Sequence, residues 1–276
     1  MKEGQGSENR RLLESRSASC RIRLGISRCL LGDAVRYDGG HKHDRYLAEV
    51  LSRVIEWVPV CPEVEAGLGT PREPMQLVGT VGRAKLLTLT TRQDRTNMLE
   101  SFSHRRISEL KSMNLSGYVF KARSPSCGVE QVPLYDRDGN VTPGGTGLFA
   151  QLFRNEFPLI PVTDEGHLAD PISRQHFLEQ VFGYSRWQAL MCGPMTRQRI
   201  ARFHRREAEE LQKRSPSHYV MLSRLVSETS QYHPNDLAAR YGQVFMQALN
   251  VAPSTHMQAG LRHSRHQYPI QKDTSL

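Results

Sequence analysis

The sequence predicts an α/β protein, with a parallel-sheet N-terminal domain flanked by helices and a small all-helical C-terminal domain. Over residues 24–182, short apolar runs alternate with helical patterns and with glycine- or proline-rich loops, which is the order that builds a parallel sheet. The composition changes near Gly183–Trp187, and three amphipathic patterns follow. The length of 276 residues, 38% of them hydrophobic, suits one large domain or two modest ones.

The predicted elements follow one another in a regular order along the chain. Each strand is a short apolar run, and each helix carries apolar residues three or four positions apart. In chain order we expect strand Leu24–Leu31, helix His43–Val54, strand Trp57–Cys61, one or two short strands in Gln76–Thr88, helix Gln93–Met113, strand Ser116–Lys121, strand Leu159–Val162 and helix Asp170–Phe182, followed by helices Met195–Lys213, Tyr219–Thr229 and Asp236–Leu249.

The ends of the chain and its charge set the predicted domain boundaries. Residues 1–23 are polar without an apolar stretch, so we expect a disordered leader and neither a signal peptide nor a membrane anchor. The α/β domain is predicted over 24–184, and a helical domain, shortened at its end, over 185–276. No run of about 18 apolar residues occurs, so we expect a cytoplasmic protein. The sequence does not set its oligomeric state.

The net charge of +9 lies in the two end segments, and residues 24–184 are close to neutral. This favours an ordinary basic surface on the helices. Binding of nucleic acid by residues 185–276 is the less favoured alternative, because aromatic residues do not interleave with the basic ones.

Three cysteines follow predicted strands. Cys29 and Cys61 lie at strand ends, and Cys127 follows the strand Ser116–Lys121 closely. The carboxyl ends of parallel strands lie at one edge of a sheet, so we expect these thiols to converge without any CxxC spacing. Three thiolates leave one position of a metal centre open for substrate. The alternative is three small buried apolar residues. Five cysteines in a cytosolic chain favour metal or catalysis over disulfides, and we assign no role to Cys20 or Cys192.

Polar residues beside these cysteines are candidates for chemistry. Glu63 and Glu65 follow the second cysteine, and an extended segment places both on its side, where a carboxylate can act as general acid or base. The alternative is a pair of exposed loop residues. Ser124 and Ser126 can donate hydrogen bonds to a substrate or cap a turn. Arg72 can orient a polar ligand or pair with Glu73.

Two glycine-containing loops are further candidates. A polar loop including Asp38 follows the first cysteine and can cover the site, and His41 and His43 within it are weaker candidates as metal ligands. Pro143–Ala150 is glycine-rich but lacks the ending of a phosphate-binding loop. We expect it to form a tight turn that allows close backbone packing.

Four motifs resemble the thiouracil desulfurase family, also known as domain of unknown function 523, and they lie in the family's order across residues 22–182. They are Gly25–Gly32, Val35–Lys42, Val58–Gly69 and Ser124–Gly128. The C-terminal part is similar, more weakly, to domain of unknown function 1722 at Phe203-His204, Ser215–Tyr219 and Tyr241–Leu249. That second resemblance implies no function.

The first resemblance implies a [4Fe–4S] cluster on Cys29, Cys61 and Cys127, with one open iron that binds a sulfur ligand. It also implies an acidic residue after the second cysteine and a serine before the third, which we assign to Glu65 and Ser124, with Glu63 and Ser126 as alternatives. Arg28 stands where many relatives have a small polar residue, which bears on the choice of substrate.

The function implied is non-redox desulfuration of a thiolated base or nucleoside such as 2-thiouracil, giving a carbonyl product and sulfide. The alternative is a non-catalytic iron–sulfur or zinc module that senses redox state or sulfide. A third hypothesis is a protein that acts on thiolated RNA through its basic helices. It predicts salt-dependent RNA binding.

Overall fold

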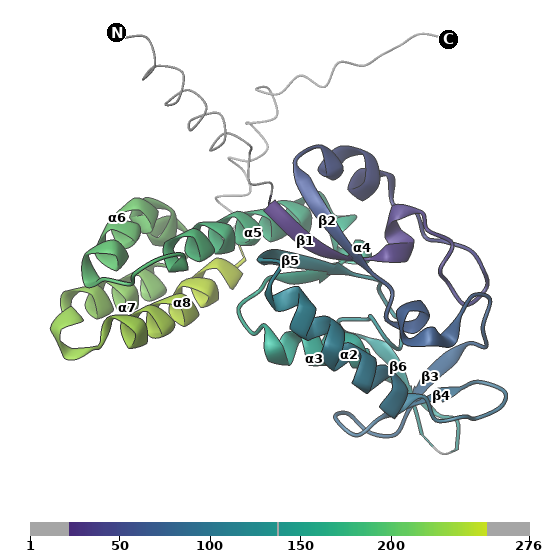
Figure 1. Cartoon of the computed structure of the whole chain (residues 1–276). Helices are drawn as coiled ribbons and strands as arrows, with labels where there is room; N and C mark the ends of the chain where they lie inside the picture. The colour runs from purple at the N-terminus through teal and green to yellow at the C-terminus, as the bar shows by residue number, and fades with distance from the viewer. Residues whose placement is uncertain (1–21, 137, 253–276) are drawn as a thin grey trace, which may run out of the picture. The chain divides into compact units, whose positions relative to one another are not determined.

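The computed structural model describes residues 22–136 and 138–252, and a parallel sheet forms the centre of its first part. Strand β1 (Ile22–Ser27) pairs in parallel with β2 (Ile55–Val60) on one side and with β5 (Leu115–Phe120) on the other. All six residues of β5 are buried, as expected for a central parallel strand. The α/β class predicted from the sequence is confirmed (Figure 1).

A second, mixed sheet lies in the same part of the chain. Its strand order is β4 (Lys85–Thr88), β3 (Met75–Val78), β6 (Val132–Tyr135) and β7 (Val141–Gly145). Strands β3 and β4 confirm the prediction for residues 76–88, whereas β6 and β7 were not predicted.

Two helices pack side by side in this part of the chain, α2 (Thr96–Lys111) and α3 (Leu148–Glu156) (Figure 1). Leu99 of α2 and Leu148 of α3 join a core with residues of the second sheet. Helix α2 confirms the predicted helix, with shorter ends.

The predicted helix 43–54 is irregular in the structure. It consists of a π-helical turn, η2 (Tyr46–Val50), and a 3-10 turn, η3 (Leu51–Arg53). The first predicted strand also ends earlier than expected, because η1 (Arg28–Leu31) is a 3-10 turn that Gly32 closes with a φ of 101°.

The chain divides into two compact units, residues 1–156 and 157–276. The predicted boundary at residue 184 therefore stays a prediction. Residues 1–21 of the predicted leader lie outside the described residues. Its last two residues, Ile22 and Arg23, belong to strand β1. The second unit begins with β8 (Val162–Asp164), where the strand was expected three residues earlier, and α4 (Glu165–Leu168) follows.

Four longer helices form the rest of the second unit. They are α5 (Pro171–Met191), α6 (Arg197–Arg214), α7 (Pro216–Ser227) and α8 (Pro234–Asn250), with the 3-10 turn η5 (Thr229–Gln231) before α8. The last three confirm the predicted helices. Helix α5 starts as predicted, where the Asp170 carboxylate accepts a hydrogen bond from the Ser173 N–H. It ends nine residues later than predicted, because it continues through Gly183.

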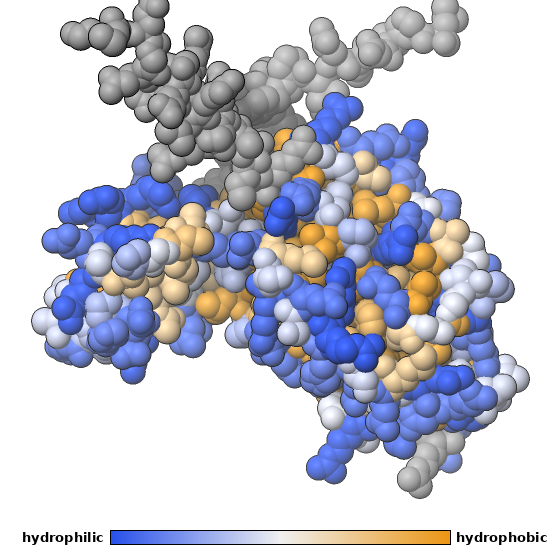
Figure 2. Space-filling view, viewed as in Figure 1, coloured by the Kyte–Doolittle hydropathy of each residue, from blue (hydrophilic) through white to orange (hydrophobic). Residues whose placement is uncertain are grey.

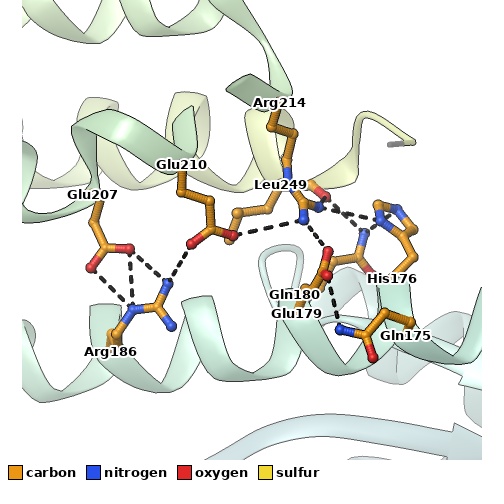
Figure 3. Close-up of polar contacts among 9 residues, drawn as sticks. All are labelled: Gln175, His176, Glu179, Gln180, Arg186, Glu207, Glu210, Arg214 and Leu249. Carbon is orange, nitrogen blue, oxygen red and sulfur yellow. Dashed lines mark hydrogen bonds and ion pairs between the residues drawn. The ribbon is translucent and has the colours of Figure 1, made fainter. Parts of the chain in front are cut away.

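The core of this bundle contains both apolar and polar side chains. Trp187 stacks on Tyr241 with ring centroids 5.6 Å apart, and Phe245 packs beside them. Figure 3 shows a network of charged residues between helices of the same unit, in which Glu207 and Arg214 are buried. Most of the bundle surface visible in Figure 2 is hydrophilic. No helix among the described residues has both the length and the apolar character needed to cross a bilayer.

Candidate active site

The carboxyl ends of β1, β2 and β5 meet at one edge of the parallel sheet. Ser27, the last residue of β1, lies beside Val60, the last residue of β2. On the other side the Lys121 N–H, just after β5, donates a hydrogen bond to Ser27 Oγ at 2.8 Å. Cys29 and Cys61 follow β1 and β2 within two residues. The predicted placement of these two cysteines at the sheet edge is therefore confirmed.

The third cysteine lies close to the other two. Cys29 and Cys127 are buried, and Cys61 is half-buried. Burial raises the pKa of the Cys127 thiol well above its usual range, and the negative charges of Cys61 and Cys29 raise it further, whereas a hydrogen bond with Ser27 lowers it. Cys61 and Cys29 are thus near enough to Cys127 to affect its ionisation.

Cys61 begins a helical turn. The Glu65 N–H donates to the Cys61 carbonyl at 2.9 Å, and the Cys61 N–H donates to Glu65 Oε1 at 2.7 Å. The turn η4 (Val64–Leu68) continues from there. The expectation of an extended segment with both carboxylates on the side of Cys61 is therefore wrong. Pro62 explains the difference, because its fixed φ suits the first turn of a helix.

This helical turn also affects the ionisation of Cys61. Burial is the largest effect and raises the pKa of its thiol, while the backbone N–H groups of Val64 and Glu63 lower it. Amide groups at the start of a helical turn favour the thiolate in this way.

Glu63 joins the three loops that carry the candidate residues. Its Oε1 accepts a hydrogen bond from Ser126 Oγ at 2.7 Å, and its Oε2 accepts one from Arg72 Nε at 2.7 Å. Arg72 Nη1 also donates to the Val35 carbonyl at 3.0 Å, toward which the Cys61 thiol points at 3.8 Å. The Arg72 side chain is only 8% exposed, so this residue holds the loops together. A role for Arg72 in substrate binding stays a prediction.

Glu65 has a different set of partners. Its Oε1 is bound by the Cys61 N–H, and its Oε2 lies 3.4 Å from Arg106 Nε of α2. The Glu65 side chain remains 25% exposed. One carboxylate oxygen is therefore held beside a cysteine while the other can still accept a hydrogen bond.

The two candidate serines differ in what their hydroxyls do. Ser124 Oγ accepts hydrogen bonds from the N–H groups of Ser126 at 3.2 Å and Cys127 at 3.1 Å. It therefore caps the turn that carries the third cysteine. Within the described residues, its own hydroxyl hydrogen has no acceptor. Ser126 is fully buried and donates to Glu63.

The glycine-rich segment packs against the same turn. The close backbone packing expected of this segment is confirmed at Gly147, but residues 143–145 belong to strand β7 and not to a tight turn. The Gly147 N–H donates to the Gly128 carbonyl at 2.8 Å. A Cβ at Gly147 would lie 2.6 Å from the carbonyl carbon of Ser126 and 2.7 Å from the backbone nitrogen of Gly128. Only glycine allows so close an approach.

The remaining candidates lie in the loop after Cys29. This loop folds back on the first cysteine, because the Lys42 N–H donates to the Cys29 carbonyl at 2.9 Å. Asp38 is exposed, and the Gly40 N–H holds the pKa of its carboxyl below the usual value. Its role toward a substrate stays a prediction. His41 and His43 are exposed neighbours with ring centroids 6.2 Å apart.

The remaining two cysteines of the chain lie elsewhere. Cys192 is exposed after α5, and Cys20 lies outside the described residues.

The three thiols do not form a site for a single ion. Within the residues that the structure describes, no three His, Cys, Asp or Glu side chains are grouped to hold one metal ion. In an iron–sulfur cluster each cysteine binds a different iron, so the cysteine sulfurs stand farther apart than around one ion. Thiolates are soft donors of the kind that hold iron–sulfur clusters. The donor set therefore fits such a cluster.

Sequence reasoning missed three residues of this region, namely Ser27, Arg106 and Tyr118. Ser27 lies within the first motif and could have been found there. Arg106 lies on α2, 41 positions after the carboxylate that it contacts, and no local pattern marks it. Tyr118 occupies a fully buried strand position whose neighbours are apolar.

Comparisons with known proteins relate this chain to one family. A family model described as 2-thiouracil desulfurase matches residues 24–165. The uncharacterized protein YbbK of Bacillus subtilis (strain 168) is 31% identical over 109 residues, which is 37% of this chain and 71% of that protein. Among solved structures, the [4Fe-4S]-dependent thiouracil desulfidase TudS is similar with a TM-score of 0.44 and 28% identity, covering 54% of this chain and 93% of that one. The family match ends before α5, and the likeness of the C-terminal helices to domain of unknown function 1722 stays a prediction.

Proposed function

Since the family model matches just over half of the chain, this chain belongs to the 2-thiouracil desulfurase family, and we propose from that premise that it desulfurates a thiolated nucleobase. The reaction is non-redox hydrolysis of a thiocarbonyl group, as in 2-thiouracil. The oxygen of water replaces the sulfur on carbon, sulfur leaves as hydrosulfide, and no electrons are exchanged. The observation that carries this proposal is the meeting of three thiols at one sheet edge, beside a carboxylate bound to the backbone of one of them.

Cys29, Cys61 and Cys127 would hold a [4Fe–4S] cluster with one open iron. The raised pKa of the Cys127 thiol beside Cys61 and Cys29 supports this assignment, because a cationic metal centre would stabilise the thiolates. When bound, the cluster supplies a Lewis acid that takes the substrate sulfur and makes the thiocarbonyl carbon electrophilic.

Glu65 would accept the proton of the attacking water and pass it toward the leaving sulfur. Its partly exposed Oε2 supports this role. Glu63 is the weaker candidate, because Ser126 and Arg72 already occupy its two oxygens.

Ser124 would position the base. Its hydroxyl accepts two backbone hydrogen bonds and keeps its own hydrogen for a ring nitrogen or oxygen acceptor of the substrate. Ser126 is less suited, because its hydroxyl is buried and committed to Glu63.

The test is an assay of anaerobically reconstituted protein with 2-thiouracil, following uracil by chromatography together with released sulfide. We expect Cys61→Ser to lose both the cluster and turnover. Cys192→Ser is the matched control, because that cysteine is exposed after α5, and it should keep both. Retained turnover in Cys61→Ser would refute the scheme. Bound iron without any turnover would favour the sensor, and bound zinc would exclude the cluster.

A further inference from the structure

Tyr118 lies at the centre of β5 in a fully aromatic setting. Its side chain is fully buried, its ring stacks on Phe120 at a centroid distance of 3.9 Å, and the ring of Phe153 meets its edge at 4.8 Å. The ring lies against Gly25 of β1, where a Cβ would come within 2.1 Å of a Tyr118 ring carbon. A phenylalanine at this position would make the same ring contacts.

The hydroxyl of Tyr118 therefore needs an explanation of its own. Among the described residues it has no hydrogen-bond partner. A buried tyrosine hydroxyl normally finds one, because leaving it unpaired destabilises the fold. Tyr241 in the helical unit shows the ordinary case, since it is equally buried and its hydroxyl lies 3.1 Å from His204 Nδ1.

Tyr118 lies near the turn that carries Cys127, because its ring centroid is 6.1 Å from that of Phe149, whose N–H donates to the Ser126 carbonyl at 2.9 Å. Burial raises the pKa of Tyr118 well above its usual value, and the negative charges of Cys127, Glu65 and Cys61 raise it further, while Arg106 lowers it. Tyr118 therefore stays protonated, and its hydroxyl hydrogen is available to an acceptor. Two of the three negative groups that it senses are cysteine sulfurs.

We propose that the buried, unpartnered Tyr118 hydroxyl donates a hydrogen bond to a sulfur atom of the cluster-loaded cysteine site, either the Cys127 thiolate or a sulfide next to it. This inference rests on the cofactor of the proposed function. A hydrogen bond to a cluster sulfur disperses its negative charge and raises the reduction potential of the cluster. The potential therefore reports this contact even though the proposed reaction exchanges no electrons.

The first measurement concerns the protein without its cluster, and compares Tyr118→Phe with Tyr241→Phe by urea unfolding. Tyr118→Phe should leave the midpoint unchanged or raise it, because it removes a hydroxyl that has no partner. Tyr241→Phe should lower the midpoint, because it leaves His204 without its Nδ1 partner. If the urea midpoint of Tyr118→Phe were as low as that of Tyr241→Phe, the Tyr118 hydroxyl would have a hydrogen-bond partner in the protein without its cluster. That result would overturn the proposal.

The second measurement is the reduction potential of the reconstituted protein, followed by electron paramagnetic resonance. Tyr118→Phe should shift the potential to a lower value, and Tyr241→Phe should match the wild type. Equal potentials in all three proteins would overturn the proposal, as would a wild type that assembles no cluster.

The outcome is separable from that of the desulfuration assay. A lower potential in Tyr118→Phe, together with no turnover of 2-thiouracil by the wild type, would support the hydrogen bond and reject the proposed substrate. Turnover with an unshifted potential would support desulfuration and reject the hydrogen bond.

Discussion

The helical bundle and the cysteine site both bury polar groups, but they balance them differently. In the bundle, Arg214 has a side chain 1% exposed, pairs with Glu179 and donates to the Leu249 carbonyl at 3.0 Å. Nearby, Arg186 donates to the buried carboxylate of Glu207 at 2.7 Å (Figure 3). Positive and negative groups alternate, so each buried charge has an opposite neighbour.

The cysteine site brings together groups that become negative on ionisation. Beyond the effect of burial, the negative charges of Cys61, Glu63 and Cys29 all raise the pKa of the Cys127 thiol, although Arg72 pairs with the Glu63 carboxylate. A buried tyrosine hydroxyl nearby is left unpartnered among the described residues. Fold stability alone does not favour a gathering of ionisable thiols. The comparison teaches that this chain pairs the buried charges of its bundle with one another, whereas it gathers ionisable thiols at the cysteine site.

The largest effect that we expect comes from Glu65→Gln. Glutamine can still accept the Cys61 N–H through its oxygen, so cluster content should stay the same. Turnover should fall by about 10²–10⁴-fold, the usual range for a lost general base. The change should appear in kcat and leave KM nearly unchanged, measured with 2-thiouracil under anaerobic conditions.

The matched variant for that experiment is Glu63→Gln. This change leaves the buried Arg72 without its charged partner, so it should lower stability more than Glu65→Gln does. If Glu65→Gln turned over substrate at the wild-type rate, the proton-transfer role would pass to another group.

Arg214→Ala tests the bundle side of the comparison. Removing one partner of a buried ion pair leaves the other uncompensated, and we expect a loss of about 3–5 kcal/mol in the free energy of unfolding. Urea denaturation measures it. Arg224→Ala is the control, because the Arg224 side chain is 78% exposed in its pair with Glu228, and solvent screens exposed pairs so strongly that little stability should be lost. Equal losses of unfolding free energy in the two variants would mean that the buried ion pair stabilises the bundle no more than the exposed one.

Gly147→Ala tests close packing behind the third cysteine. The new methyl group would overlap the backbone of Ser126 and Gly128, and overpacking of this kind costs about 1–3 kcal/mol. Because the same turn carries Cys127, iron content after reconstitution should fall as well. Gly40→Ala is the control, since its nearest contact is the exposed Asp38 carboxylate at 3.3 Å. Normal iron content in Gly147→Ala would show that this turn adapts without loss.

The sequence predicted the parts of the fold that local patterns determine. Apolar runs predicted strands β1, β2 and β5. The predicted ends of β1 and β2 indicated that Cys29 and Cys61 lie at the edge of the sheet. Strand β7 was missed because its five residues include one proline and two glycines, which are rare in strands, and its pairing with β6 holds it in place. Helix α5 was cut short at Gly183, where the absence of a side chain lets Leu249 pack closely.

The site was predictable in its residue types but not in its contacts. The four motifs contain the three cysteines, both glutamates and both serines. Their roles depend on contacts between distant positions, such as Ser126 with Glu63 and Glu65 with Arg106. Such pairs have no sequence signature, because packing of separate loops and helices brings them together.

The smallest effect that we expect is an acid sensitivity of the bundle. Burial lowers the pKa of His204 below its ordinary value near 6.5. The unfolded chain therefore binds more protons than the folded one as the pH falls below about 6.5, so stability is present above that pH and is lost on acidification. One histidine contributes about 1.4 kcal/mol for each unit of pKa shift.

Trp187 lies in the bundle core, and Trp57 lies in β2, so a Trp57→Phe background lets fluorescence follow the bundle alone. In that background, the free energy of unfolding in urea should be lower at pH 5.5 than at pH 7.5. His204→Gln should reduce this difference. The pKa of His176 is also lowered by burial and by Arg214. His176 should therefore account for the pH dependence of stability that remains in His204→Gln. The same slope with and without His204 would assign the acid sensitivity to His176, and the buried charge network around Arg214 would then become the part of the bundle that senses pH.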